Sequence, residues 1–175
     1  MKYLKINSLL IVCFLLLTFS SERSLTIKSS ILEIRGYVVH KDKNIEKASI
    51  KLYQNNKIVQ MMNTKKGGKF QFMLFSGMKY MVEINKPGFI TERIQISTEE
   101  KTEFNGKYLY EFRVGLINSN KFKGVDISNL DFPTALIKYN ISEGEYSHDA
   151  KYSKFVRAEM RKLQEKARIA KEKAR

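Results

Sequence analysis

Residue types that commonly carry out chemistry are few in this sequence. Histidine occurs twice, at His40 and His148, and neither has a second histidine, a cysteine or a carboxylate at metal-ligand spacing. The single cysteine, Cys13, lies within an apolar N-terminal run. We therefore predict no metal site and no cofactor. His40 is expected to be a surface turn residue, and His148 to start the last helix beside its cap.

Carboxylates and nucleophiles also lack a catalytic arrangement. Two pairs of acids occur, Glu99-Glu100 and Glu143 with Glu145, but they lie in polar connections where water favours the ionised carboxylate. There is no Gly-x-Ser-x-Gly elbow, phosphate-binding loop or dinucleotide fingerprint. The sequence thus predicts no catalytic residue and no small-molecule substrate, and we expect a protein that is not an enzyme.

Positive charge is the main remaining chemical feature. The 175 residues carry a formal net charge of +14, and residues 151–175 alone hold ten Lys or Arg against three Glu. Such asymmetry indicates a basic tail that meets an anionic surface or partner; a solvated lysine-rich helix is the alternative. The residues predicted to form a docking surface are Lys154, Arg157, Arg161, Lys162 and Arg168.

A helix is expected over residues 147–175. Glycine and proline are absent from His148 onward, and Ser147 or Asp149 can serve as the N-cap. The predicted apolar stripe contains Tyr152, Val156, Leu163, Ala167 and Ala170. Because the apolar side chains become smaller after Leu163, we expect the first turns to dock on the domain and the remainder to project into solvent or toward a partner.

The N-terminus has the pattern of a secretory signal. Lys2 and Lys5 precede an apolar run from Leu9 to Leu17, which is too short to span a membrane unless it is retained as an anchor. We predict a signal peptide over residues 1–20 and an exported protein, either periplasmic or at the outer surface. Cleavage, retention and lipidation at Cys13 all remain open. If the signal is removed, no thiol remains for a disulfide.

Alternating apolar residues predict short β-strands in the middle of the chain. Ala48, Ile50 and Leu52 fall on one face of their segment, and Phe70, Phe72 and Leu74 do so in another. Structural turns are expected at Gly67 and Gly68, because glycine reaches positive φ without strain, and at Pro87-Gly88. The predicted fold is a small antiparallel β-sandwich, prealbumin-like or Ig-like, with additional C-terminal strands and the basic helix.

Several short motifs, taken in order, resemble the carboxypeptidase regulatory-like domain. They are Gly36-Tyr37-Val38, Ala48-Ser49-Ile50-Lys51-Leu52, the segment 63–70, Gly77 before Tyr80, and Lys86-Pro87-Gly88-Phe89. The domain is a transthyretin-like sandwich akin to the B-type repeats of collagen adhesins, and the resemblance covers residues 31–98. Lys65 stands where that family usually has an acid. The resemblance implies an accessory module that acts as a spacer, folding aid or docking surface.

Two further strands are expected over residues 104–141, one through the alternating stretch 107–118 and one through Ala135 to Ile141, the latter at a sheet edge. Because each would otherwise expose an apolar face, both should extend the sandwich.

The preferred hypothesis for function is a non-catalytic envelope protein that acts as a structural or protein-docking module. Its expected partner is an envelope protein or an anionic membrane or cell-wall surface, and no nucleic acid is expected for an exported chain. The alternative is a carbohydrate- or peptide-binding module that uses exposed aromatics such as Tyr53, Tyr108 and Tyr110. The alternation, however, turns Tyr108 and Tyr110 toward a core.

Overall fold

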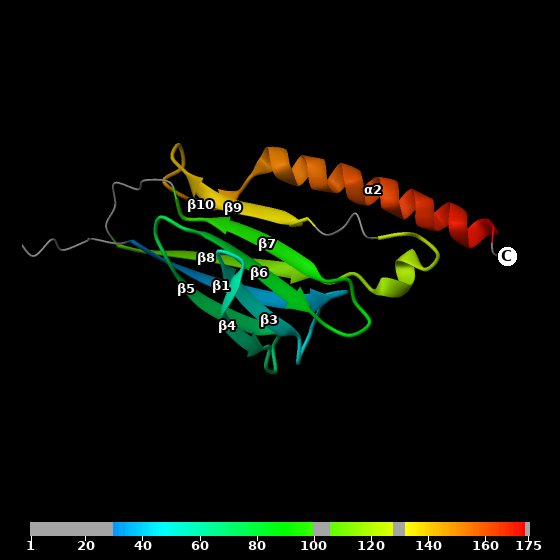
Figure 1. The fold of residues 1–175 in the computed structure, drawn as a ribbon, viewed down its shortest axis with the longest axis horizontal. Helices are drawn as coiled ribbons and strands as arrows, with labels where there is room; N and C mark the ends of the chain where they lie inside the picture. The colour runs from blue at the N-terminus through cyan, green and yellow to red at the C-terminus, as the bar shows by residue number, and fades with distance from the viewer. Residues whose placement is uncertain (1–29, 100–105, 128–131, 174–175) are drawn as a thin grey trace, which may run out of the picture.

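A computed structural model describes residues 30–99, 106–127 and 132–173 of the chain. The predicted signal peptide over residues 1–20, including Cys13, lies outside the described residues. Two β-sheets pack face to face, and one long helix runs along one side of the sandwich (Figure 1). The predicted fold class, a mainly β-sandwich with additional C-terminal strands and a basic C-terminal helix, is confirmed.

The smaller sheet has four strands among the described residues, with the first strand at its centre. This strand, β1 (Ile31–His40), pairs antiparallel with β2 (Lys43–Asn44) and with β5 (Lys69–Phe75). It pairs in parallel with β8 (Lys107–Gly115) from Ile31 to Val39. The early strand is therefore held by partners from both halves of the chain.

The larger sheet has six strands among the described residues. In spatial order they are β10 (Glu145–His148), β9 (Ala135–Asn140), β7 (Glu92–Ser97), β6 (Lys79–Asn85), β3 (Ser49–Gln54) and β4 (Lys57–Asn63). All neighbours are antiparallel except β7 and β9, which are parallel. The strand β9 was expected at the edge of the sheet. The edge is instead formed by β10, which was not predicted and which pairs with β9.

Two strand pairs depart from the predicted antiparallel arrangement, since β1 with β8 and β7 with β9 are parallel. After β7 the chain crosses to the smaller sheet as β8, and it then returns to the larger sheet beside β7 as β9. Parallel neighbours need such crossover connections, whereas a tight hairpin can join only antiparallel strands. The parallel pairs β1–β8 and β7–β9 make the two sheets mixed.

Alternation along the strands produces the main core. Phe70 and Phe72 each expose only 3% of their surface, and they face the aliphatic side chains of the opposite sheet. The fully buried aliphatic residues include Leu32, Ile34, Val38, Ile50, Leu52, Leu74, Val82, Ile84, Ile96 and Ile137. Burying one such side chain contributes about 1.5–3 kcal/mol, so this core is the main source of stability.

Gly36 is required by the packing of this core. It pairs with Phe70 on the neighbouring strand β5, and a Cβ added at Gly36 would lie 2.0 Å from the Phe70 ring. The aromatic ring thus covers the backbone where a side chain would normally stand.

The predicted turns lie at the ends of strands. Gly67 and Gly68 have φ values of +97° and +68°, and the Gly68 carbonyl accepts a hydrogen bond from Val38 N at 2.9 Å. At Pro87-Gly88, Gly88 has φ +84° and Phe89 N donates to Lys86 O at 3.0 Å. Proline followed by glycine at positive φ is typical of a type II turn, which ends the pairing of β6 with β7.

The long helix, α2 (Ala150–Lys173), begins three residues later than the predicted start at residue 147. Ser147 and His148 belong instead to β10, where they pair with β9. Asp149 is the N-cap, since its carboxylate accepts a hydrogen bond from Tyr152 N at 2.8 Å. Within the described residues, no helix is both long enough and apolar enough to cross a membrane.

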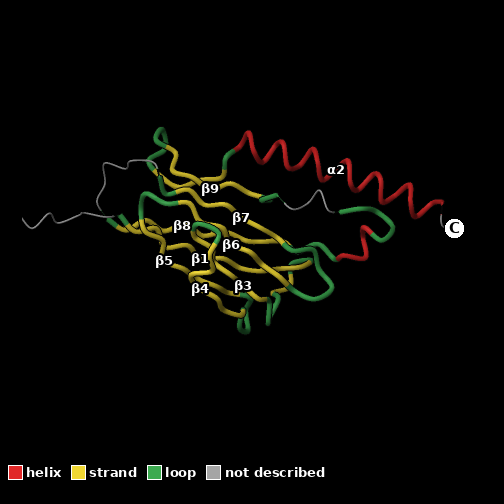
Figure 2. Tube along the Cα trace, viewed as in Figure 1, coloured by secondary structure: helices red, strands yellow, loops and turns green. Residues whose placement is uncertain are grey.

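The second half of α2 does not project away from the domain, and that expectation is wrong. Leu163 and Ala167 are buried against Ile90 and Phe122, in what we call the helix cluster. Phe122 ends a short 3-10 turn, η2 (Ser119–Phe122), which lies under the helix (Figure 2). A large aromatic from η2 thus compensates for the small apolar side chains of α2.

Candidate functional site

A groove of about 860 Å³ lies between the second half of α2, the segment around η2 and the end of β1. Four lysines line it: Lys41, Lys121, Lys123 and Lys171. Small residues of the helix and loop, Ala167, Ala170 and Gly124, complete the wall. No carboxylate is among the described residues that line this space, which we call the lysine groove.

Three separate parts of the chain bring the lysines together. Lys41 stands in the two-residue turn between β1 and β2, where Lys41 and Asp42 have φ values of +48° and +63°. Lys121 and Lys123 come from η2 and the turn after it, and Lys171 from the last turn of α2. Sequence reasoning missed this site because its lysines are far apart in the chain.

Backbone hydrogen bonds fix the segment that carries Lys121 and Lys123. Leu116 N donates to Val39 O at 2.8 Å, and Ser119 N donates to Gly88 O at 3.0 Å. The Asn118 side chain caps η2 by accepting from Asn120 N at 2.9 Å. The segment is thus tied both to the end of β1 and to the Pro87-Gly88 turn.

His40 lines the groove and holds it together, so its expected role as a surface turn residue is wrong. Its Nδ1 lies 2.8 Å from Leu116 O, and its ring packs edge-on against Phe89 at 5.0 Å. Because a carbonyl can only accept, Nδ1 carries the proton in this contact. In the neutral ring, Nε2 is then the nitrogen that can accept.

The five predicted docking residues are all exposed, but none of them lines the lysine groove. Helical periodicity places Lys154 and Arg161 on the side of α2 opposite the buried Val156 and Leu163, with Arg157 on the flank of that side. We call this the outer face of α2. Among the described residues, no ion pair involves these three.

The other two predicted residues are neutralised within the helix. Lys162 contacts Glu159 at 2.7 Å, and Arg168 contacts Glu165 and Glu172 at 2.7 Å each. The hydrogen bond to Glu165, followed by the attraction of both carboxylates, raises the pKa of Arg168. The structure therefore separates residues that the sequence had grouped: three carry unbalanced charge and two do not.

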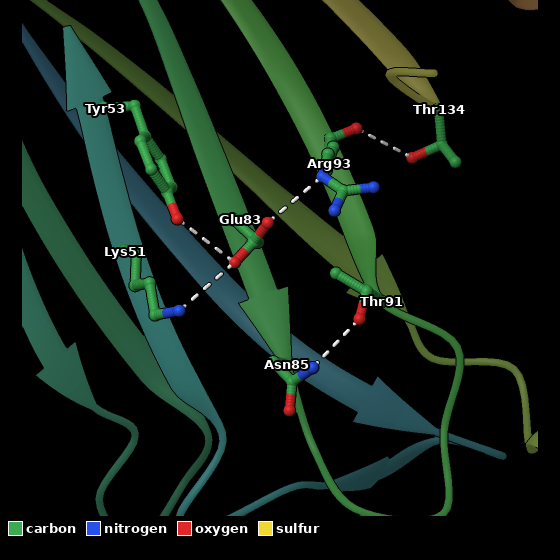
Figure 3. A network of polar contacts seen from close by, with 7 residues as sticks. All are labelled: Lys51, Tyr53, Glu83, Asn85, Thr91, Arg93 and Thr134. Carbon is green, nitrogen blue, oxygen red and sulfur yellow. Dashed lines mark hydrogen bonds and ion pairs between the residues drawn. The ribbon is translucent and has the colours of Figure 1, made fainter. Parts of the chain in front are cut away.

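The tyrosines of the carbohydrate alternative do not share one surface. Tyr53 lies on the outside of the larger sheet, where its hydroxyl donates to Glu83 at 3.3 Å (Figure 3). The same carboxylate contacts Lys51 at 3.4 Å and Arg93 at 3.1 Å, so these side chains form a ladder across β3, β6 and β7 (Figure 3). This arrangement serves cross-strand pairing.

Tyr108 and Tyr110 are half-buried between β8 and the strands β9 and β10. Tyr108 packs edge-on against Tyr139 and Tyr146, with ring centroids 5.5 Å apart in both cases. Tyr110 contacts His148. His148 belongs to β10, so the prediction that it starts the helix is wrong. Burial raises the pKa of Tyr110 and lowers that of His148, so the pair stays neutral and joins the two sheets.

Sequence reasoning also missed two buried carboxyl groups. Glu33 pairs with Lys107 and accepts hydrogen bonds from Arg35 at 2.7 Å and Gln71 at 2.8 Å, and the contacts with Lys107 and then Arg35 lower its pKa. Glu92 is also buried, and desolvation raises its pKa against the opposing effect of a hydrogen bond with Thr134. Among the described residues, no three His, Cys, Asp or Glu side chains come together as a metal site.

No protein-family model matches the sequence, and no curated protein matches it significantly. Solved structures that are similar include the TIE protein of Bacillus anthracis, at 23% identity and TM-score 0.40, with 50% of this chain and 16% of that chain covered. A chlorocatechol 1,2-dioxygenase from Pseudomonas putida matches at 10% identity and TM-score 0.38, with 52% and 61% covered. The pilus 2b backbone protein of group B streptococcus matches at 11% and 0.35, with 53% and 43% covered.

These similarities extend over about half of the chain, and at such TM-scores they carry no information on function. The β-sandwich is established by the strand pairing itself. The narrower resemblance to carboxypeptidase regulatory-like domains has no family match behind it and stays a prediction.

Proposed function

We propose that this chain is a non-catalytic protein of the cell envelope that docks on an acidic partner protein through the outer face of α2. One observation carries the proposal. The helix buries a stripe on one side along most of its length and presents Lys154, Arg157 and Arg161, without ion pairs among the described residues, on the other. An exposed row of unbalanced charge on a fixed element suits electrostatic recognition.

The start of α2 and its middle are both held, which makes its outer face a fixed platform. Near the start, Tyr152 donates to Pro133 O at 2.6 Å and Asp149 pairs with Lys138 at 3.0 Å. Farther along, Leu163 packs in the helix cluster. Binding through such a helix avoids most of the free energy that ordering a flexible tail would cost.

An acidic protein fits the outer face better than a membrane does. Arg157 and Arg161 are one turn apart, about 6 Å along the helix, and a guanidinium can bind a carboxylate through two parallel hydrogen bonds. Interfaces between proteins are enriched in arginine. Insertion into a membrane would require a broader apolar surface.

The location in the envelope rests on the N-terminal signal pattern, in the periplasm or at the outer surface. The carbohydrate-binding alternative is not favoured, because Tyr53 belongs to the Glu83 ladder while Tyr108 and Tyr110 pack inside the sandwich. For the same reason we do not assign those tyrosines to a binding site.

Zero-length cross-linking tests the docking proposal. A carbodiimide joins lysine amines to carboxylates that touch them, so in an envelope preparation Lys154 of the full chain should become linked to Asp or Glu of a single partner protein identified by mass spectrometry. The Arg157→Glu/Arg161→Glu variant should lose this link. Charge reversal is preferable to deletion of residues 157–175, because deletion would also uncover the helix cluster.

The matched control is Lys57→Glu/Lys65→Glu, which makes the same change in charge at the opposite edge of the larger sheet. This control should keep the link. Equal cross-linking in all three proteins would contradict the proposal. The unmodified chain could instead bind phosphatidylglycerol vesicles and lose this binding when the two arginines are changed. That result would mean that the outer face of α2 binds a membrane surface and not a protein.

A further inference from the structure

The lysine groove differs in its balance of charge from the part of α2 that carries Lys162 and Arg168. Elsewhere on the helix, Lys162 and Arg168 lie against glutamates. In the groove, four lysines from three parts of the chain line one space, and the described lining residues include no carboxylate. Like charges gathered in this way repel each other, and a bound anion would relieve that repulsion.

The polar lining adds donors to the charge. The side-chain amides of Asn118 and Asn120 line the groove beside the four lysines, while His40 directs its Nδ1 proton to Leu116 O. The backbone that carries them is fixed by the hydrogen bonds from Leu116 and Ser119, so the donors are largely positioned before any ligand arrives. Hydrogen bonds from charged donors to an anion are stronger than neutral ones.

The size of the groove fits a small molecule. Its volume of about 860 Å³ falls within the range of roughly 300–1,000 Å³ that ligand sites commonly have. The wall formed by Ala167, Ala170 and Gly124 has short side chains, which leaves room beside the lysines. A neutral part of a ligand could rest on this wall while its charged part meets the ammonium groups.

The number of lysines indicates the kind of anion. A single carboxylate would leave most of the positive charge unbalanced, whereas a diphosphate group carries several charges within a few ångströms. Lysine presents a compact charge with three donors and is a common phosphate ligand. A ligand with two linked phosphates could contact lysines from η2 and from α2 at the same time.

We propose that the lysine groove binds a diphosphate group, carried by a soluble molecule or by a lipid head group. This site lies beside the helix cluster and is separate from the outer face of α2, so it goes beyond the docking function proposed above. The diphosphate would join the loop of η2 to the last turns of α2 and to the β1–β2 turn.

Calorimetric titration of the folded chain with inorganic pyrophosphate tests the proposal, with sodium sulfate at equal ionic strength as the comparison. Pyrophosphate should bind at one site and more tightly than sulfate. Lys121→Gln/Lys123→Gln should weaken binding about tenfold or more, because two charge-assisted contacts are removed. Both lysines are exposed, so the variant should fold normally.

Lys171→Gln removes one contact from the other side of the groove and should weaken binding by a smaller factor. The matched control, Lys57→Gln/Lys65→Gln, loses the same charge as the double variant far from the groove and should bind as the unmodified chain does. The Arg157→Glu/Arg161→Glu variant should also bind pyrophosphate with unchanged affinity. Failure of the docking proposal and failure of this one can therefore be told apart.

Three outcomes would overturn the proposal: no pyrophosphate binding, equal loss in the groove variant and its control, or affinity no greater than for sulfate. A second arm compares vesicles that contain a lipid diphosphate with vesicles of phosphatidylglycerol. Preference for the former that depends on Lys121 and Lys123 supports a lipid-borne ligand, and binding of free pyrophosphate alone supports a soluble one.

Discussion

The interior of the sandwich takes every second residue from long runs of strand, whereas the helix cluster takes one or two buried residues from each of three separate segments. Ile90 follows the Pro87-Gly88 turn, Phe122 ends η2, and Leu163 and Ala167 come from α2. The main core contains many side chains with no exposure, while each member of the helix cluster keeps 4–9% of its surface exposed. The hydrophobic effect thus produces a large core that excludes solvent completely and a small cluster that stays slightly exposed.

This difference has consequences for function, because both candidate surfaces depend on the shallow cluster. The lysine groove is built on it, and the outer face of α2 is held in place by it. Regions with few buried contacts open at lower free energy than the core does. We therefore expect α2 to loosen before the sandwich unfolds.

The largest effect is expected in the main core. Phe72→Ala removes a buried aromatic side chain and should lower the free energy of unfolding by about 3–5 kcal/mol in urea titration. Phe75→Ala is the matched control, since Phe75 lies on the same strand and is 54% exposed; its effect should stay within about 0.5 kcal/mol. Similar losses in the two variants would mean that the faces of β5 are assigned wrongly.

A smaller and more local effect is expected in the helix cluster. Leu163→Ala should cost about 2 kcal/mol, at the low end for a leucine, because the site is shallow. The helix signal at 222 nm should be lost at lower urea than the tyrosine fluorescence of the sandwich, and the two transitions should separate further than in the unmodified chain.

Ile169→Ala serves as the control, because Ile169 is on the same helix but 41% exposed, and it should leave both transitions nearly unchanged. If Leu163→Ala shifts both signals together, α2 and the sandwich unfold as one unit, and the proposed difference between the two cores is wrong.

The cap of α2 should contribute less. Asp149→Ala removes the acceptor for Tyr152 N and should cost about 1 kcal/mol. Asp149→Asn retains an N-cap acceptor but loses the charge that pairs with Lys138, so it should cost clearly less. Thermal unfolding of the two variants checks this order. If Asp149→Ala and Asp149→Asn destabilise the protein equally, Asp149 acts through its ion pair with Lys138 and not as the N-cap.

The buried carboxyl groups should give opposite dependences on pH. The pKa of Glu33 is lowered, first by the hydrogen bond from Lys107 and then by Arg35, so its stabilisation is present above the ordinary value of 4.5 and is lost as the pH falls through the lower folded-state pKa. Burial raises the pKa of Glu92, so its ionisation costs stability at neutral pH, and that cost disappears as the pH falls through the raised folded-state pKa.

Accordingly, Glu33→Gln should destabilise the protein at pH 7, and the difference from the unmodified chain should shrink below pH 4.5. Glu92→Gln should stabilise it slightly at pH 7, and this gain should shrink as the pH approaches 4.5. Urea unfolding between pH 3 and pH 8 measures both. Shifts of the same sign at pH 7 would contradict the two environments described for these groups.

Local patterns were enough to predict most of the sandwich. Alternation at residues 48–53 and 69–74 identified buried faces, and glycine or proline identified the turns at Gly67-Gly68 and Pro87-Gly88. The parallel neighbours of β1 and β7 were not predictable in this way, because pairing between strands far apart in the chain leaves no local signal. The short strand β10 has too few alternating residues to stand out.

The polar features were harder to predict. Glu33 falls on the outward side of its strand by alternation, yet Arg35, Lys107 and Gln71 cover it almost completely. The lysine groove joins residues as distant as Lys41 and Lys171. The charge of the tail did indicate a basic surface, but only the packing of Leu163 against Phe122 shows which side of α2 is presented.

Hydrogen exchange along α2 tests the central claim, that the helix is held over most of its length and presents a fixed basic face. Backbone amides near Leu163 and Ala167 should be protected to a degree similar to those near Val156, and Leu163→Ala should remove the protection of the second half alone. Exchange of the second half at the rate of an unstructured peptide in the unmodified chain would contradict the claim, and the platform on which both proposed surfaces depend would not exist.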